Sequence, residues 1–181
     1  TADGAILIIA MIQSWTQQLL ENDAVLSDVD EEAITGLDLE NAYGRAHRSA
    51  CVRGARERVP NLAVLGVAQW QLKRTGVWQR ADGKWRRSTT ARGGWQGARL
   101  MQIMFCMGLE STFSRIPMLQ ESGATITRIG YQDDNYLIGS AARQSAGWDE
   151  FVDILAEDGH RLRTHKCKTW VPRVDAAREA T

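Results

Sequence analysis

The chain has 181 residues, of which 44% are hydrophobic, which predicts a single domain with one buried core over residues 1–181. Its three cysteines form neither a CxxC pair nor an even set, so no disulfide framework is expected, and an intracellular setting, in the nucleus or cytoplasm, is favoured. The longest uncharged stretch, residues 4–20, is interrupted by polar residues and is too short to span a membrane.

The net charge is zero, but the charges are sorted along the chain. Residues 1–44 contain nine acidic and no basic residues, whereas residues 45–100 contain thirteen basic and two acidic residues, a net +11. A basic block of this size often marks contact with phosphate backbones, and four tryptophans within it could supply stacking surfaces. The alternative is a solvated basic face with tryptophans in the core.

The first half of the chain alternates between predicted helices and strands. Apolar residues at helical spacing predict a helix over residues 5–20, and AITGLDLE predicts a strand that ends near Asp38. RAHRSACVRGARERV predicts a helix with its basic residues outward, and another helix is expected over residues 62–73. Asp82 and Gly83, between two strand-like runs, are the signal for a two-residue type I′ hairpin turn.

The second half continues the alternation. A glycine-rich turn, GGWQG, precedes a predicted apolar helix over residues 98–113. The strand-like runs TITRIGY and NYLIG flank Asp133 and Asp134 and predict a hairpin. A predicted helix over residues 146–158 ends at Gly159, and KTWV predicts a last strand.

Asp133 and Asp134 stand side by side at the tip of the predicted hairpin. Two adjacent carboxylates repel unless a cation lies between them, so a magnesium site is expected, with the pKa of one carboxyl raised when no metal is bound. Asp38, at the end of another strand, supplies a third ligand if the two strands are neighbours. Three acids on adjacent strand ends suit two-metal phosphoryl transfer. The alternative is an exposed acidic turn, because Asp is common in turns.

Four motifs occur in the order and approximate spacing of palm motifs A to D of reverse transcriptases. They are LDLENAYG, GGWQGARL, YQDD and GHRLRTHKCKT. The chain resembles this family, especially its non-long-terminal-repeat retrotransposon and group II intron branch, over residues 36–172. The resemblance implies an α+β polymerase palm, an antiparallel sheet backed by helices with a ferredoxin-like core. It also implies RNA-directed DNA synthesis, in which a primer 3′-hydroxyl attacks a dNTP with two Mg²⁺ ions, or Mn²⁺, as cofactors.

The resemblance assigns roles to single residues. It makes Asp38, Asp133 and Asp134 the metal ligands, the same three residues that the carboxylate argument selects. Lys166 matches the motif D lysine suggested to protonate the departing pyrophosphate, and Tyr131 matches the tyrosine near the primer end. The other substrate-binding positions are the aromatic residue that excludes a ribose 2′-hydroxyl and two motif B residues: Tyr43, Gln96 and Gly97.

Several of these assignments have a plainer alternative. Tyr43 could be a core tyrosine, Gln96 a simple loop residue and Lys166 a surface lysine. Three further residues match no catalytic position and are expected at the surface or hydrogen-bonded: His47, His160 and His165.

The sequence also departs from the family. Gly44 stands where the family often has Asp, His160 where it often has Leu, and Arg163 where it often has Asn. None of these departures removes a metal ligand.

The resemblance implies an RNA template, a DNA primer and dNTPs as partners, together with fingers and thumb segments of a parent polyprotein that are missing from this chain; no membrane partner is expected. Without fingers and thumb, activity of the isolated chain is uncertain. A decayed or domesticated palm that binds nucleic acid without catalysis is the alternative. RNA-directed RNA synthesis is disfavoured by Tyr43 and by YQDD in place of GDD.

Overall fold

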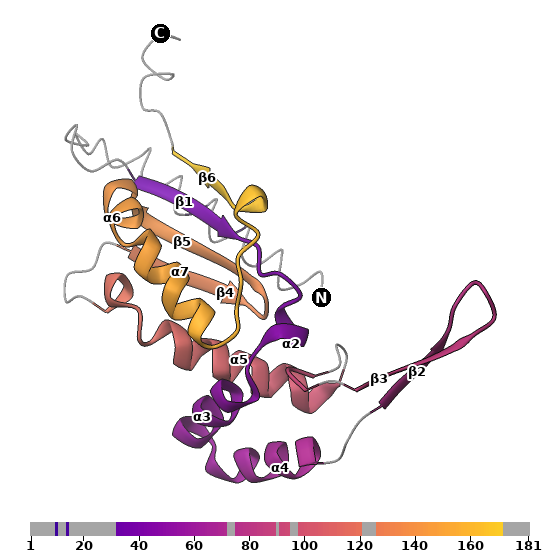
Figure 1. Cartoon of the computed structure of the whole chain (residues 1–181). Helices are drawn as coiled ribbons and strands as arrows, with labels where there is room; N and C mark the ends of the chain where they lie inside the picture. The colour runs from indigo at the N-terminus through magenta and orange to yellow at the C-terminus, as the bar shows by residue number, and fades with distance from the viewer. Residues whose placement is uncertain are drawn as a thin grey trace, which may run out of the picture. The chain divides into compact units, whose positions relative to one another are not determined.

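The computed structural model of the chain contains two compact units, whose elements are drawn in Figure 1. The described residues are 32–71, 75–89, 91–94, 98–120 and 126–171, with Ala10 and Ser14. Unit 1 comprises Thr1–Leu39, Ile116–Val152 and Leu162–Thr181, and unit 2 comprises Glu40–Arg115 and Asp153–Arg161. The helix expected over residues 5–20 lies outside the described residues except at Ala10 and Ser14. The single domain expected over residues 1–181 stays a prediction.

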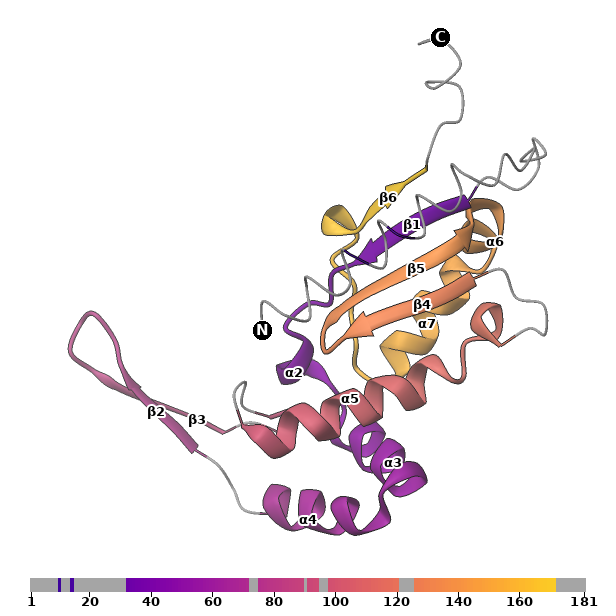
Figure 2. The same ribbon diagram turned by 180° about the vertical axis from the view of Figure 1, so that it is seen from behind.

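Unit 1 is built on a four-stranded antiparallel sheet in the order β4-β5-β1-β6 (Figure 2). Its strands are β1 (Glu32–Leu37), β4 (Ile126–Tyr131), β5 (Asp134–Ser140) and β6 (Lys168–Trp170). β1 pairs with β5 on one side and β6 on the other, and most of its residues are buried, as suits a central strand. The antiparallel sheet expected from the sequence is therefore confirmed.

Two helices follow β5 directly, α6 (Ala141–Ala146) and α7 (Trp148–Glu157), and α6 and the first turns of α7 lie over one face of the sheet (Figure 1). The buried Gln144 of α6 fixes this arrangement. Its amide nitrogen donates to the carbonyl oxygens of Ala33 and Gly139 at 3.1 and 3.0 Å, and its amide oxygen accepts from Thr35 Oγ1 at 2.6 Å. A buried amide satisfied in this way ties the helix to β1 and β5.

Unit 2 is mainly helical. Its helices are α2 (Ala42–Arg45), α3 (Arg48–Arg58), α4 (Pro60–Gln71) and α5 (Arg99–Phe113). α4 begins at Pro60, two residues earlier than expected, because the fixed φ of proline suits the first position of a helix. No helix in the described part of either unit is long and apolar enough to cross a membrane.

Unit 2 also contains a two-stranded ribbon, residues 75–89, formed by β2 (Thr75–Gln79) and β3 (Trp85–Thr89). The predicted two-residue type I′ turn is wrong. Gly83 N–H donates to Arg80 O at 2.9 Å and Arg80 N–H donates to Lys84 O at 3.0 Å, so three residues form the loop. Of these, only Gly83 has a positive φ, +75°, which is the pattern of a type I turn followed by a glycine bulge.

α3 and α5 pack closely because each has a glycine where they cross. A Cβ atom on Gly54 would lie 2.0 Å from the carbonyl oxygen of Met107, and one on Gly108 would lie 2.7 Å from the Cα of Cys51. The two backbones therefore touch at this point. Burial at the crossing raises the pKa of Cys51 to about 12, which makes it an unreactive thiol.

A buried carboxylate joins the helices of unit 2. Asp158, 5% exposed, accepts hydrogen bonds from Arg53, from Thr112 Oγ1 at 2.7 Å and from Arg115 Nη2 at 2.7 Å. Burial by itself raises the pKa of Asp158, but the bonds from Arg53 and Thr112 and the two arginine charges lower it below the ordinary value. The carboxylate therefore stays ionised and connects α3 and α5 to the end of α7.

His160 contradicts the expectation of a surface or hydrogen-bonded histidine. It is 3% exposed, its ring lies edge-on to Phe105 with 5.8 Å between centroids, and neither ring nitrogen has a hydrogen-bond partner in the described structure. Burial lowers its pKa to about 4. His47 does bond, through Nδ1 to Glu157 O at 3.0 Å, and His165 is exposed, so the expectation holds for these two.

The free energy of unfolding of the wild type should fall at acidic pH because of His160, and His160→Leu should abolish this fall. The imidazole has a pKa of 6.5 when unfolded and about 4 when folded, so only the unfolded chain takes up the proton as the pH falls through this window. The wild-type free energy of unfolding should drop by about 2 kcal/mol between about pH 7 and pH 5, which urea unfolding measures. The lowered pKa of Asp158 acts only below this window.

The matched control is His165→Leu, because His165 is exposed. This variant should keep the wild-type pH dependence, whereas His160→Leu should lose it and gain about 1–2 kcal/mol near pH 7, since no buried ring nitrogen stays unpaired. An acid-induced drop of the same size in His160→Leu and the wild type would show that His160 is not the titrating group.

Candidate active site

The turn between β4 and β5 holds two of the three candidate aspartates. Tyr131 pairs with Asp134, so Gln132 and Asp133 form a two-residue turn. Gln132 has φ +58°, in the left-handed region, although it is not glycine. Backbone strain of this kind persists where the surrounding structure enforces it, and it is often found at functional sites. The letters YQDD do not reveal this conformation.

The buried side chain of Asn135 stabilises the turn through hydrogen bonds. It is 1% exposed, its Nδ2 donates to Gln132 O at 3.2 Å and its Oδ1 accepts from Arg128 Nη1 at 2.8 Å. Gly130 leaves room for this side chain, because a Cβ atom there would lie 2.2 Å from Asn135 Oδ1. These contacts hold the turn in place. Sequence reasoning missed Asn135, although an Asn directly after two Asp residues and facing a Gly across a hairpin is a usable signal.

Asp38 lies next to this turn in the sheet. β1 pairs antiparallel with β5, and its last residue, Leu37, faces Asn135. Asp38 comes directly after Leu37, as Asp134 comes directly before Asn135, so both aspartates lie at the same end of the β1–β5 pair. The expectation that the two strands are neighbours is therefore confirmed.

The pKa of one carboxyl group in the Asp133–Asp134 pair is raised, as expected for two neighbouring carboxylates. The pKa of Asp134 is raised above its ordinary value, first by the partial loss of water around the carboxyl group and then by the negative charges of Asp133 and Asp38. The same repulsion favours binding of a cation at this position.

Arg163 is a functional candidate that sequence reasoning missed. Its Nε lies 2.6 Å from Asp38 Oδ1, and its backbone N–H donates to Asp38 O at 2.8 Å. On the other side, Asp38 N–H donates to Cys167 Sγ at 3.4 Å. The Asp38 carboxylate is thus neutralised by a guanidinium group. The only sequence signal was the departure from the Asn that is frequent in the family at this position.

The three aspartates carry the oxygen ligands that a hard divalent cation prefers, but their side chains are not arranged around a single position. No group of three or more Asp, Glu, His or Cys side chains among the described residues is arranged to hold a metal ion. The carboxylate oxygens of Asp38, Asp133 and Asp134 are the ligands that Mg²⁺ prefers, and the pKa of Asp134 is raised by partial desolvation and then by the charges of the other two carboxylates. The residue types therefore suit magnesium, while Asp38 is paired with Arg163 and a magnesium site stays a prediction.

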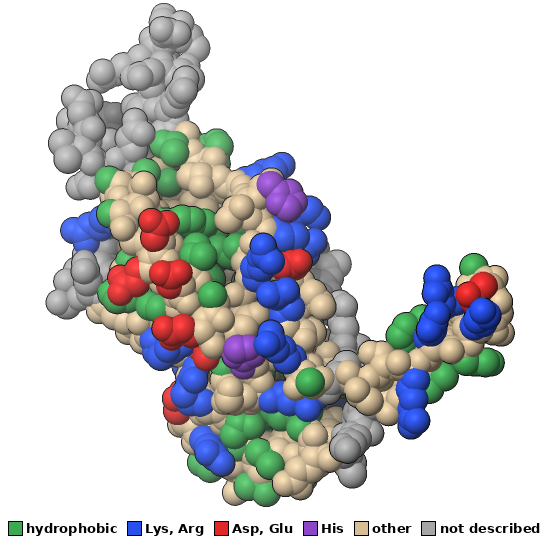
Figure 3. All heavy atoms as spheres, viewed as in Figure 1, with side chains coloured by type: hydrophobic (Ala, Val, Ile, Leu, Met, Phe, Trp, Pro, Cys, Tyr) green, Lys and Arg blue, Asp and Glu red, His purple; other side chains and the backbone are tan. Residues whose placement is uncertain are grey.

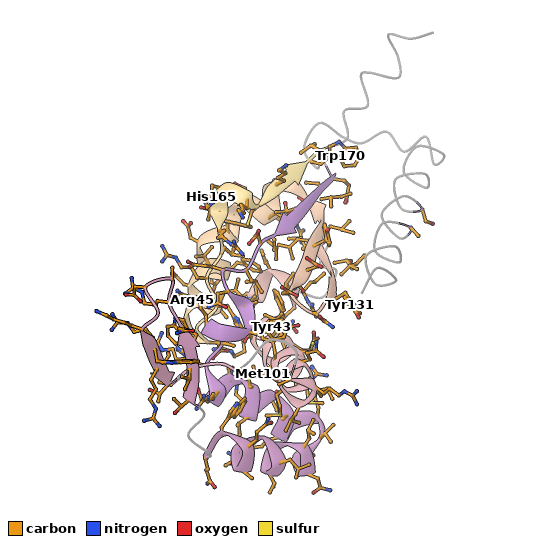
Figure 4. The ribbon with its side chains drawn as sticks, turned by 90° about the vertical axis from the view of Figure 1, so that its right-hand side faces the viewer. Tyr43, Arg45, Met101, Tyr131, His165 and Trp170 are labelled. Carbon is orange, nitrogen blue, oxygen red and sulfur yellow. The ribbon has the colours of Figure 1, made fainter. Side chains whose placement is uncertain are left out.

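Two other predicted site residues, the substrate-binding Tyr131 and the catalytic Lys166, lie in the same unit as the aspartates. Tyr131 is the last residue of β4 and is half-buried beside the turn (Figure 4). Lys166 ends a short 3₁₀-helix, η2 (Thr164–Lys166), which precedes β6, and its side chain is exposed. Its backbone N–H donates to Arg163 O at 2.7 Å, so the lysine and the arginine belong to one turn.

Tyr43 belongs to unit 2, where Figure 4 labels it on α2. It is 6% exposed, and its ring packs on Phe105 with 4.4 Å between centroids. Its carbonyl oxygen accepts from Gly94 N–H at 3.0 Å, and a Cβ atom on Gly93 would lie 2.0 Å from the same oxygen. The start of the GGWQG loop is therefore held against Tyr43.

Two predicted residues of this loop, Gln96 and Gly97, lie outside the described residues. The structure accordingly brings Asp38, Asp133 and Asp134 to neighbouring strand ends and describes Tyr43 separately, in unit 2. Their catalytic and binding roles stay predictions.

Comparison with known proteins identifies the fold. No protein-family model matches the chain, and no curated protein matches it. Among solved structures, apo telomerase from Candida tropicalis, truncated from its C-terminal domain, is similar with a TM-score of 0.67 and 16% identity, over 92% of this chain and 35% of that chain. The fold is reverse-transcriptase-like. This confirms the expected α+β class, while the retrotransposon branch stays a prediction.

Telomerases bound to RNA show the same similarity. The telomerase from Candida albicans in complex with a TWJ fragment of telomeric RNA has a TM-score of 0.65 and 16% identity, over 92% of this chain and 30% of that chain. The corresponding Candida tropicalis complex has a TM-score of 0.65 and 15% identity, over 92% and 29%. The chain thus spans about a third of the length of these telomerase chains. At this identity the similarity concerns the reverse-transcriptase-like fold.

Proposed function

We propose that the chain is the catalytic palm of an RNA-directed DNA polymerase, a nucleotidyltransferase of the retrotransposon or group II intron type. The observation that carries this proposal is the placement of Asp38 and the Asp133–Asp134 turn at the same end of the paired strands β1 and β5, in a reverse-transcriptase-like fold. Its partners would be an RNA template, a DNA primer and dNTPs, together with the fingers and thumb segments of a parent polyprotein. We place the activity inside the cell, in the nucleus or cytoplasm.

The three aspartates would act as the metal ligands. Two Mg²⁺ ions, or Mn²⁺, would stabilise negative charge on the attacking primer hydroxyl and on the departing pyrophosphate. The chain contributes by fixing the carboxylates before substrate arrives. The Asn135 contacts hold the Asp133–Asp134 turn, and the β1–β5 register sets Asp38 beside it.

The remaining site residues would handle substrate. Lys166, whose exposed ammonium group is a proton donor, would protonate the leaving pyrophosphate. Tyr131, beside the turn, would contact the primer end. Gln96 and Gly97 would pack against the incoming nucleotide and the template.

Primer extension on an RNA template tests this proposal. The chain joined to its fingers and thumb segments should add dNTPs to a DNA primer when Mg²⁺ is present, and a chelator should stop the reaction. A well-folded protein that binds primer–template but adds no nucleotide with Mg²⁺ or Mn²⁺ would overturn the catalytic proposal.

Tyr43→Ala should increase the use of ribonucleotides by about tenfold or more relative to deoxynucleotides, because the missing ring no longer excludes the 2′-hydroxyl. The measurement is the ratio of rNTP to dNTP incorporation, which does not change when only the folded fraction falls. Tyr43→Phe is the matched control, since it keeps the ring that packs on Phe105, and should discriminate like the wild type. If Tyr43→Ala and Tyr43→Phe discriminate equally, Tyr43 is a core residue and not a gate.

A second candidate function is a palm that binds nucleic acid without catalysis. The observation that favours it is the ion pair of Arg163 with Asp38, in which a guanidinium group neutralises the carboxylate that a metal would need. The two candidates make different predictions for a variant at Arg163.

Arg163→Asn should strengthen divalent-metal binding by about fivefold, because the metal no longer competes with an ion pair worth about 1 kcal/mol. Titration of the chain with Mn²⁺, followed by electron paramagnetic resonance, measures this directly. Arg161→Asn is the matched control, since Arg161 is exposed and pairs with Glu40 instead, and should bind like the wild type. If neither the wild type nor Arg163→Asn binds Mn²⁺, the non-catalytic function is favoured.

A further inference from the structure

The ribbon of unit 2, residues 75–89, has large apolar side chains that are exposed to solvent. Every residue from 77 to 89 is exposed, including Trp78 at 49%, Trp85 at 68% and Val77 at 59%. A two-stranded hairpin is marginally stable by itself in water, because it has no second layer to bury its side chains. Exposed apolar groups concentrated on such an element indicate a binding surface.

The pairing of the strands distributes these groups over both faces. Trp78 faces Arg86 across the ribbon, and Val77 faces Arg87. Trp85 faces Gln79 and lies two residues before Arg87, on the same face. Each face therefore combines one tryptophan with one arginine.

The charge of the ribbon identifies the kind of partner. Four basic residues and one acidic residue give it a net charge of +3, and Figure 3 shows basic and hydrophobic side chains over most of its visible surface. Within the described structure none of the four basic side chains forms a salt bridge. They are Arg80, Lys84, Arg86 and Arg87.

Several arginines elsewhere in the basic block form ion pairs. Arg53 pairs with Asp158, Arg58 with Glu110, and Arg45 with Glu40. Trp70, the other described tryptophan of the block, lies under the guanidinium group of Arg48, 5.7 Å from its ring centroid. Arg56, Arg92 and Arg99 are exposed as well, but among the described residues of the block only the ribbon combines exposed basic side chains with tryptophans of high exposure, Trp78 and Trp85.

We propose that the ribbon binds single-stranded nucleic acid, with bases stacked on Trp78 and Trp85 and phosphates held by Arg86 and Arg87. On each face an aromatic ring lies on the same side as a cationic group, which suits a single strand, because its unpaired bases expose their faces while the backbone supplies one charge per nucleotide. A base pair within a duplex offers no free face to a tryptophan. The inference deepens the proposed function, and rests on it for the kind of partner, by adding a contact outside the aspartate site.

Fluorescence anisotropy with a labelled oligouridylate tests the stacking contacts. Trp78→Ala combined with Trp85→Ala should weaken binding by about tenfold or more, since stacking on one aromatic ring is worth at least a factor of about five. Trp170→Ala removes an equally exposed tryptophan in unit 1 and should bind like the wild type. Wild-type affinity in the double variant would overturn the proposal, and so would an equal loss on a fully paired RNA duplex.

The salt dependence of the same binding tests the phosphate contacts. Arg86→Gln combined with Arg87→Gln should flatten the slope of log affinity against log salt by about 1.4, because each single-strand phosphate contact contributes about 0.7. Arg56→Gln, an exposed arginine of α3, is the matched control and should leave the slope unchanged if Arg56 makes no phosphate contact. An unchanged slope in the ribbon variant would show that these arginines do not contact phosphate.

Three further outcomes are distinguishable. Self-association of the chain that disappears in Trp78→Ala would assign the ribbon to a second copy of the protein and overturn the proposal. The binding assay contains no metal and no dNTP, so it does not depend on catalysis. If binding depends on the ribbon but no primer is extended, only the proposed polymerase function is rejected. If primers are extended and the ribbon variants bind like the wild type, only the proposal that the ribbon binds nucleic acid is rejected.

Discussion

Asp133→Asn should reduce primer extension by about a thousandfold or more, which corresponds to about 4 kcal/mol of lost transition-state stabilisation. Asn has nearly the same shape as Asp, so the turn held by Asn135 should keep its conformation while one metal-ligand charge is lost. No other carboxylate replaces it without rebuilding the turn, because Asp38 and Asp134 are already required as ligands in the proposed mechanism.

A second measurement separates this electrostatic explanation from a structural one. The charge of Asp133 raises the pKa of Asp134, so Asp133→Asn should bring the pKa of Asp134 closer to its ordinary value, as followed by carboxyl NMR titration. Primer–template binding should be largely unchanged. Asp149→Asn, at an exposed position of α7, is the control and should extend primers normally. Near-normal extension by Asp133→Asn would mean that YQDD is only a turn.

Gly54→Ala should lower the free energy of unfolding by about 3 kcal/mol or more, because a methyl group is forced into a contact between two backbones. The added Cβ would lie 2.0 Å from Met107 O and 2.5 Å from Met107 C, and backbone atoms of a packed helix do not move aside as a side chain does. α3 and α5 would have to separate. Urea unfolding followed by circular dichroism measures the change.

Gly66→Ala provides a matched control, since it makes the same substitution inside another helix of unit 2. Its Cβ would meet the terminal methyl of Met104 at 2.5 Å, a group at the end of a flexible side chain. The gain in helix propensity offsets part of the contact, so stability should change by less than about 1 kcal/mol. If Gly54→Ala is no less stable than Gly66→Ala, the two helices do not cross as closely as described.

The sequence by itself determined the local features of the site. Alternating strand-forming residues placed Asp38 at the end of one strand and the Asp133–Asp134 pair between two others, and Gly159 was expected to end a helix, as its φ of +84° two residues after α7 confirms. Such features depend on residues close together in the chain, since hydrophobic periodicity and the conformational freedom of glycine act over a few residues.

The tertiary structure alone decided the features that need distant segments. The pairing of β1 with β5 brought Asp38 to the same end of the sheet as Asp134, the turn before β6 brought Arg163 to Asp38, and packing of Phe105 buried His160 without a hydrogen-bond partner in the described structure. The positive φ of Gln132 also follows from the pairing of β4 with β5 and from the buried Asn135. Strand order and register are set by burial across the whole sheet, and a short stretch of sequence does not specify which distant segment will supply a neighbouring side chain.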